Sequence, residues 1–128
     1  MTISLPPETS SPPRLQPSGW LRYFSFSVDH KVIGLQYLVC GFVFYLIGGA
    51  LAGAIRTELT SPVSDFMARD VYNQVLTLHG TVMIFLWIVP VVNGAFGNYL
   101  IPFYVGARDM AFPRLNAVAF WLIPPAGL

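Results

Sequence analysis

Two long runs of sequence without a charged residue constrain the fold of this chain more than any other feature. The first lies between Lys31 and Arg56, and the second lies between Asp70 and Arg108. A transmembrane helix needs about 20 consecutive, mainly apolar residues, so each run can hold one span. Only 10% of the 128 residues are Asp, Glu, Lys or Arg, against about a quarter in soluble proteins. We therefore predict an all-α membrane protein.

The apolar runs and the polar segments between them place three predicted helices. We expect helix I at about 32–55, helix II at about 74–104, and the start of helix III at about 117–128. The last run is about 12 residues long, which is too short to cross a bilayer. We therefore expect a fragment of a transmembrane helical bundle, with two complete helices and the start of a third.

The N-terminal region changes composition near residue 20. Residues 1–19 are rich in proline, serine and threonine and bury too little apolar surface to offset the entropy of ordering the chain, so we predict a disordered tail. Residues 20–31 mix aromatic and charged side chains, a composition typical of a segment in the membrane interface. The membrane domain therefore extends over residues 20–128.

The small residues and the single cysteine in helix I indicate how this helix packs. Gly49 and Gly53 lie four residues apart, a spacing that predicts close approach of a neighbouring helix. Cys40 lies in the middle of the apolar run and has neither a disulfide partner nor metal-ligand spacing. We interpret it as an inert core thiol.

The distribution of charge bears on partners and orientation. A net charge of +1 gives no basic surface for nucleic acid, so nucleic-acid binding is excluded. Lys and Arg are enriched on the cytoplasmic side of membrane proteins. The N-terminal side and the second loop carry five of them, against two in the first loop, so we predict a cytoplasmic N-terminus. The five are Arg14, Arg22, Lys31, Arg108 and Arg114, and the two are Arg56 and Arg69.

His79 is the only ionisable side chain within helix II, and such a residue inside a span is a functional candidate because it is costly to bury. Met83, Leu86 and Pro90 follow at four, seven and eleven residues, so the same helix face is apolar and broad. The adjacent Gly80 leaves room for a flat macrocycle. These features favour His79 as an axial haem ligand. The alternative is a histidine hydrogen-bonded to a neighbouring helix.

Other polar residues leave their roles open. The second histidine, His30, lies at the opposite end of helix I, so a second axial ligand has to come from elsewhere. Arg56 emerges in the same leaflet as His79, where it can donate hydrogen bonds to a polar haem substituent or anchor the helix at the interface. Asp109 follows helix II on the cytoplasmic side. It is either a point of proton uptake or a solvated loop charge.

Four segments carry a resemblance to a known family. They are residues 78–85 (LHGTVMIF), 96–98 (FGN), 106–116 (GARDMAFPRLN) and 120–122 (FWL). They resemble the N-terminal portion of subunit I of the haem-copper terminal oxidases, the cytochrome c oxidase type. The similarity begins near residues 29–34 (DHKVIG) and covers about 100 of the 128 residues, and the spans are most like those of bacterial, cyanobacterial members.

The resemblance implies a role for five residues. His79 matches the histidine that ligates the low-spin haem a, and Arg56 matches the arginine that hydrogen-bonds its formyl group. Asp109 matches the aspartate at the mouth of a proton pathway. Asn98 and Asn116 match asparagines that line this pathway near its entrance.

At two further positions the resemblance implies a role less directly. Glu58 resembles an acidic residue that helps to bind a calcium or sodium ion in some members. Arg108 stands where mitochondrial members have proline. A cation next to Asp109 favours the charged form of its carboxylate, so this departure bears on how fast protons are collected.

The resemblance also implies the activity of a parent protein, the twelve-helix catalytic subunit of a proton-pumping oxidase. Its expected partners are subunits II and III, and cytochrome c or another small soluble electron donor. A high-spin haem and copper would be bound beyond residue 128, so the 128 residues alone should be inactive. We expect an integral protein of the bacterial plasma membrane or the cyanobacterial thylakoid. The alternative is a non-catalytic, truncated scaffold or assembly protein.

Overall fold

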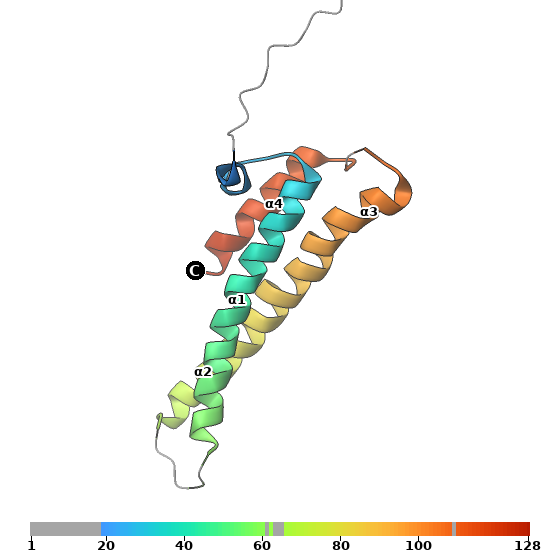
Figure 1. The fold of residues 1–128 in the computed structure, drawn as a ribbon. Coiled ribbons are helices and arrows are strands. Elements are labelled where there is room, and N and C mark those ends of the chain that lie inside the picture. The colour runs from blue at the N-terminus through green and yellow to red at the C-terminus, as the bar shows by residue number, and fades with distance from the viewer. Residues whose placement is uncertain (1–18, 61, 63–65, 109) are drawn as a thin grey trace, which may run out of the picture.

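The computed structural model describes residues 19–60, 62, 66–108 and 110–128. The tail predicted at residues 1–19 lies almost entirely outside the described residues, as does Asp109. The described part is helical and contains no strand, which confirms the all-α prediction (Figure 1). Its elements are η1 (Trp20–Phe24), α1 (His30–Glu58), α2 (Arg69–Thr81), η2 (Val82–Ile88), η3 (Pro90–Phe96), α3 (Gly97–Val105) and α4 (Pro113–Ala126).

Two helical stretches are long and apolar enough to cross a membrane, namely His30–Glu58 and Arg69–Val105. Both begin before the residues expected from the sequence, near 32 and 74, because polar residues in the first turn add to the helix without adding to the apolar run. The two stretches form an antiparallel hairpin, and α4 returns beside the N-terminal half of α1 (Figure 1). The N-terminal end of α1 and the α3–α4 connection therefore lie at the same end of the molecule.

The start of α1 is defined by capping. The Asp29 carboxylate accepts a hydrogen bond from the Lys31 amide at 3.0 Å, and the Asp29 carbonyl accepts from the Ile33 amide at 3.0 Å. An aspartate at this position satisfies an amide that has no partner within the helix. Arg56 lies in the last turn, where a cation interacts favourably with the negative end of the helix dipole.

The second span changes its helical geometry around Pro90. Residues Val82–Ile88 and Pro90–Phe96 are π-helical, with α-helical turns before and after. Proline has no amide hydrogen, and its ring clashes with the carbonyl four residues earlier in an α-helix. Widening of the turns accommodates this clash, so the span continues past Pro90 to Val105 instead of ending there.

The α3–α4 turn depends on a glycine. Gly106 ends α3 with φ of +70°, a left-handed conformation that side chains other than glycine rarely adopt. The Ala107 amide donates to the Pro102 carbonyl at 2.9 Å, which satisfies one of the last carbonyls of the helix. Pro113 then occupies the first turn of α4, where its missing amide hydrogen costs nothing.

Glycines on α1 allow the second span to approach closely, but they are different glycines from those predicted. A Cβ on Gly34 would lie 3.2 Å from the Ala95 carbonyl oxygen, and one on Gly48 would lie 2.5 Å from the Met83 sulfur. Gly41 makes the same kind of contact, so the spacing is seven residues. The prediction based on Gly49 and Gly53 was wrong for this contact, since nothing lies within 4 Å of a Cβ at either position.

The buried core lies in the half of the hairpin that α4 covers. Five buried residues contributed by α1, η3 and α4 form this cluster, and the Tyr37 and Phe120 rings meet edge to face at 5.1 Å between centroids. Such aromatic pairs are favourable beyond the burial of their area. The members of the cluster are Ile33, Tyr37, Ala95, Ala117 and Phe120.

The segment before α1 is fastened to the helix by a buried glutamine. Gln36 Nε2 donates to the Tyr23 carbonyl at 2.8 Å and to the Ser25 carbonyl at 3.0 Å, and the side chain is only 6% exposed. These bonds satisfy two carbonyls of a segment that includes η1. The sequence contained no signal for this role, because glutamine in an apolar run has no fixed partner.

Candidate functional site

His79 lies in the last turn of α2 and is partly buried against α1. Its Nδ1 atom is 2.9 Å from the carbonyl oxygen of Gly48. The absence of a side chain at Gly48 brings the two helices close enough for this contact. The hydrogen bond to a neighbouring helix, which was the alternative explanation for this histidine, is therefore present in the structure.

This hydrogen bond occupies only one of the two ring nitrogens. A carbonyl oxygen can only accept, so Nδ1 carries the hydrogen in the neutral ring and Nε2 keeps its lone pair. Metal-bound histidines generally donate their other ring N–H in this way, and the bond fixes the tautomer and the orientation of the ring. The histidine is thus both anchored and chemically suited to bind iron through Nε2.

Three glycines near this histidine have no close neighbour where a side chain would extend. Nothing lies within 4 Å of a Cβ built on Gly49, Gly53 or Gly80, so these positions border open space among the described residues. Gly80 is adjacent to His79, and the other two lie on α1 near Gly48. The residues present therefore fit a macrocycle held by His79.

Two asparagines lie at the other end of the hairpin. Asn98, on α3, is 4% exposed and donates from Nδ2 to the Gly94 carbonyl at 2.6 Å, whereas its buried Oδ1 has no partner among the described residues. Asn116, on α4, has a buried Nδ2 that likewise finds no partner in the described part of the chain. Asn98 lies one turn after Ala95, and Asn116 adjoins Ala117, so both flank the same end of the core cluster.

Unpaired buried amide atoms usually have an ordered water as partner, because an unsatisfied polar group in the interior is costly. The amide oxygen of Asn98 can accept a hydrogen bond from water, and the amide nitrogen of Asn116 can donate one. Each of these two positions within the apolar bundle is therefore suited to hold water.

Comparison with known proteins identifies the family. Residues 32–128 match the family model described as Cytochrome C and Quinol oxidase polypeptide I. Cytochrome c oxidase subunit 1 of Thermostichus vulcanus is 67% identical over 108 residues, which are 84% of this chain and 20% of that protein. The subunit of Synechocystis is 60% identical over 128 residues, the whole of this chain and 22% of that protein. The chain belongs to this family.

More distant relatives keep the similarity. Cytochrome c oxidase polypeptide 1 of Halobacterium salinarum is 45% identical over 113 residues, which are 88% of this chain and 19% of that protein. The resemblance to subunit I, and to cyanobacterial members above all, is thereby confirmed. The chain spans about a fifth of the length of the curated relatives it matches. Subunit 1 is part of a multi-subunit membrane complex, and haem and copper are the cofactors of this oxidase family.

Arg56 lies at the same end of the hairpin as the start of α2 (Figure 1). Its side chain is exposed, and among the described residues it makes no hydrogen bond or ion pair with another side chain. The structure therefore does not bring Arg56 and His79 into direct contact. The guanidinium remains available to a group placed beside α1, which is what its predicted role requires.

Glu58, the candidate cation ligand of the oxidase family, has a local partner. Its Oε2 accepts a hydrogen bond from the Met67 amide at 3.0 Å and so joins the end of α1 to the approach to α2. No group of three or more His, Cys, Asp or Glu side chains gathers into a metal site within the described residues. The contact that Glu58 makes in the structure is thus with the backbone of Met67.

Two groups that make buried contacts in the structure could not be predicted from the sequence. The Gly48 carbonyl orients His79. Every residue has a backbone carbonyl, so the residue type does not show which one accepts this hydrogen bond. Gln36 anchors the segment before α1 and also has a buried Oε1 without a partner among the described residues. The seven-residue spacing of Gly34, Gly41 and Gly48 on α1 was the one signal in the sequence for the close approach at Gly48.

Proposed function

We propose that this chain contributes an axial ligand of the low-spin haem and the entrance of a proton pathway to the catalytic subunit of a proton-pumping terminal oxidase. The observation that carries the proposal is the 2.9 Å contact between His79 Nδ1 and the Gly48 carbonyl. It leaves Nε2 as the ligand atom and holds the ring in one orientation. The full-length subunit would transfer electrons from cytochrome c, or another small soluble donor, to oxygen.

The haem side of the proposal uses residues of both spans. His79 binds the iron, and the open positions at Gly49, Gly53 and Gly80 accommodate the ring. Arg56 donates charge-assisted hydrogen bonds to a polar substituent at the edge of the haem, for which the family offers the formyl group of haem a. The haem, when bound, supplies one-electron redox chemistry whose potential depends on such surroundings.

The proton side of the proposal uses the opposite end of the hairpin. Asp109 takes up a proton from cytoplasmic water, and Asn98 and Asn116 hold the waters that conduct it inward. Their unpaired amide atoms support this assignment, because each needs a partner that the apolar core does not provide. The N-terminus is then cytoplasmic, since the start of α1 and the α3–α4 connection lie at one end (Figure 1).

The assembly and location follow from the same proposal. Subunits II and III would cover part of the apolar surface, and a high-spin haem and copper would be bound by later parts of the full-length subunit. The membrane is the bacterial plasma membrane or the cyanobacterial thylakoid.

A His79→Ala variant of the full-length complex tests the haem assignment. Removing the imidazole leaves the iron one bond short, so the low-spin absorption band should be lost while the subunit still assembles. Thr77→Ala, an exposed position on the same helix, is the matched control and should keep the band. A normal low-spin spectrum in assembled His79→Ala would refute the assignment.

A further inference from the structure

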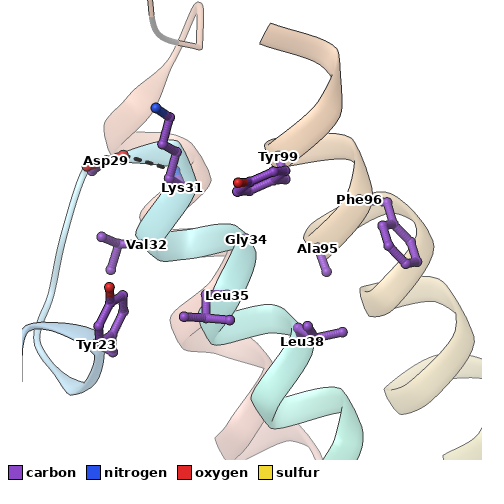
Figure 2. Close-up of a pocket in the computed structure, with 10 residues that line it drawn as sticks. All are labelled: Tyr23, Asp29, Lys31, Val32, Gly34, Leu35, Leu38, Ala95, Phe96 and Tyr99. Carbon is purple, nitrogen blue, oxygen red and sulfur yellow. Dashed lines mark hydrogen bonds between the residues drawn. The ribbon is translucent and has the colours of Figure 1, made fainter. Parts of the chain in front are cut away.

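A groove runs along α1 near its N-terminal end, and it has no part in the proposed haem or proton chemistry (Figure 2). The space is about 560 Å³. Its floor is the close contact between α1 and η3, where Gly34 meets the backbone of Ala95. The residues that line it are Tyr23, Asp29, Lys31, Val32, Gly34, Leu35, Leu38, Ala95, Phe96 and Tyr99.

The groove is amphipathic along its length. Leu35, Leu38 and Phe96 make one part apolar, whereas the ammonium of Lys31 extends beyond the first turn of α1, at the other end (Figure 2). The uncharged run of α1 starts immediately after Lys31, so this residue marks the boundary between hydrocarbon and headgroups. Tyr23 and Tyr99 also line the groove, and tyrosines are enriched at this depth because their rings are apolar and their hydroxyls polar.

We propose that this groove binds an anionic phospholipid, with the phosphate at Lys31 and an acyl chain along Leu35, Leu38 and Phe96. The division of the groove into a cationic end and an apolar trough matches the division of a phospholipid. Basic pockets between transmembrane helices on the cytoplasmic side are known to hold anionic headgroups. A lysine stem lying on apolar surface with its ammonium in the headgroup region is also the favoured arrangement in a membrane.

A helix from another part of the complex is a less favourable occupant on grounds of charge. It would cover the Lys31 ammonium, and a buried cation needs a paired carboxylate. The carboxylate already in the groove, Asp29, accepts a hydrogen bond from the first turn of α1. A phosphate can pair with the ammonium in the hydrated headgroup region, so that the ammonium does not have to be buried.

Asp29 allows a second test of the proposal, in which the expected change in lipid binding has the opposite sign. Its negative charge lies in the same groove as Lys31 and opposes the binding of an anion. Asn is as good a helix cap as Asp, so Asp29→Asn removes this charge and keeps the start of α1. The anionic lipid should therefore bind more tightly to Asp29→Asn and less tightly to Lys31→Met.

The test uses the full-length complex in nanodiscs that contain phosphatidylcholine with a minor fraction of phosphatidylglycerol. Native mass spectrometry counts the lipids of each kind that remain bound after release. Lys31→Met should lower the occupancy of one phosphatidylglycerol about fivefold, the effect of one lysine near an anionic surface. Asp29→Asn should raise it, and Leu38→Trp should abolish it by filling the trough.

Arg114→Met is the matched control, because Arg114 is an exposed cation at the same end of the molecule and does not line the groove. It should leave the count unchanged. An equal loss in Lys31→Met and Arg114→Met would overturn the proposal in favour of general electrostatic attraction. Unchanged occupancy in Leu38→Trp, or equal retention of phosphatidylcholine, would also overturn it. None of these variants alters a residue assigned to the haem or to protons.

Discussion

The two ends of the α1 hairpin use the same apolar composition to build different environments. Near the α1–α2 loop, α1 meets its neighbour through the backbone of Gly48, and Gly49, Gly53 and Gly80 border open space. Near the N-terminal end of α1, three elements, α1, η3 and α4, pack together in the buried core around Tyr37. The polar groups that remain there are single amide atoms buried among apolar side chains.

The difference between the two ends indicates which kind of group each end can bind. Open space beside an anchored imidazole suits a large rigid cofactor, whose binding does not require the helices to move. Single buried amide atoms among apolar side chains suit water, since each atom offers one or two hydrogen bonds. The proposed function therefore assigns electron chemistry and proton chemistry to opposite ends of one pair of helices. The experiments below test that separation.

The largest effect is expected for Asp109→Asn in the full-length complex. This change keeps the shape of the side chain but removes the group that takes up a proton. Turnover should fall about a hundredfold, the usual scale of a lost acid–base group. Both haem spectra should stay normal, because the residues proposed to hold the haem lie at the other end of the hairpin.

Oxygen consumption and proton ejection by reconstituted complex measure this prediction. Arg108→Ala serves as a neighbouring charge control and should change the rate far less. Wild-type turnover and pumping in Asp109→Asn would reduce this residue to a solvated loop charge. The two ends would then differ in packing but not in function.

The next largest effect is expected for Gly48→Val. A side chain at this position would meet the Met83 sulfur, and the first added carbon alone would lie 2.5 Å from it. Overpacking of this kind costs about 1–3 kcal/mol. The helices should separate, the His79 hydrogen bond should break, and the low-spin haem band should weaken together with the melting temperature.

Gly97→Ala is the matched control for Gly48→Val. A Cβ at Gly97 would make only ordinary contacts, at 3.8 Å from Ile101 and from the Val92 carbonyl. Alanine is a better helix former than glycine, so this variant should be as stable as the parent or more so. Equal haem loss in both variants would mean that any added bulk disturbs the fold, and that Gly48 has no special position.

The helices and the candidate histidine could be predicted from the sequence, whereas the contacts between segments could not. The helices followed from charge-free runs, and His79 stood out because it was the single histidine within helix II, which has no charged residue. The glycines at the close contact between α1 and the second span could not be identified in advance. Glycines on several faces of α1 have similar spacing, and only packing decides which face is used. The partner of Gln36 was equally hidden, since its acceptors are backbone carbonyls of a separate segment.

A smaller effect is expected for Gln36→Leu. This variant removes the hydrogen bonds to the carbonyls of Tyr23 and Ser25, and a lost bond to a buried group costs about 1–3 kcal/mol. The segment that includes η1 should detach from α1 and be cut faster by protease, while the haem spectrum is unchanged. Gln74→Leu, at an exposed position of α2, is the control. Equal protease resistance in both variants would contradict the anchoring role.

The smallest effect is expected for Arg56→Met, and it should be spectroscopic. The Arg56 side chain is exposed and makes no side-chain bond among the described residues, so its loss should barely change stability. A charge-assisted hydrogen bond to a conjugated carbonyl stabilises the polarised excited state of a haem. Its removal should therefore shift the low-spin band to the blue without loss of the haem.

Arg69→Met is the matched control for Arg56→Met, because Arg69 is the other exposed arginine at the same end of the hairpin. It should leave the band where it is. An unshifted band in Arg56→Met would assign the arginine to the membrane interface. His79 would then be the one residue of this chain that acts on the haem, and the open space beside α1 would serve the ring without a donor at its edge. A shift in both variants would instead indicate the general field of nearby cations.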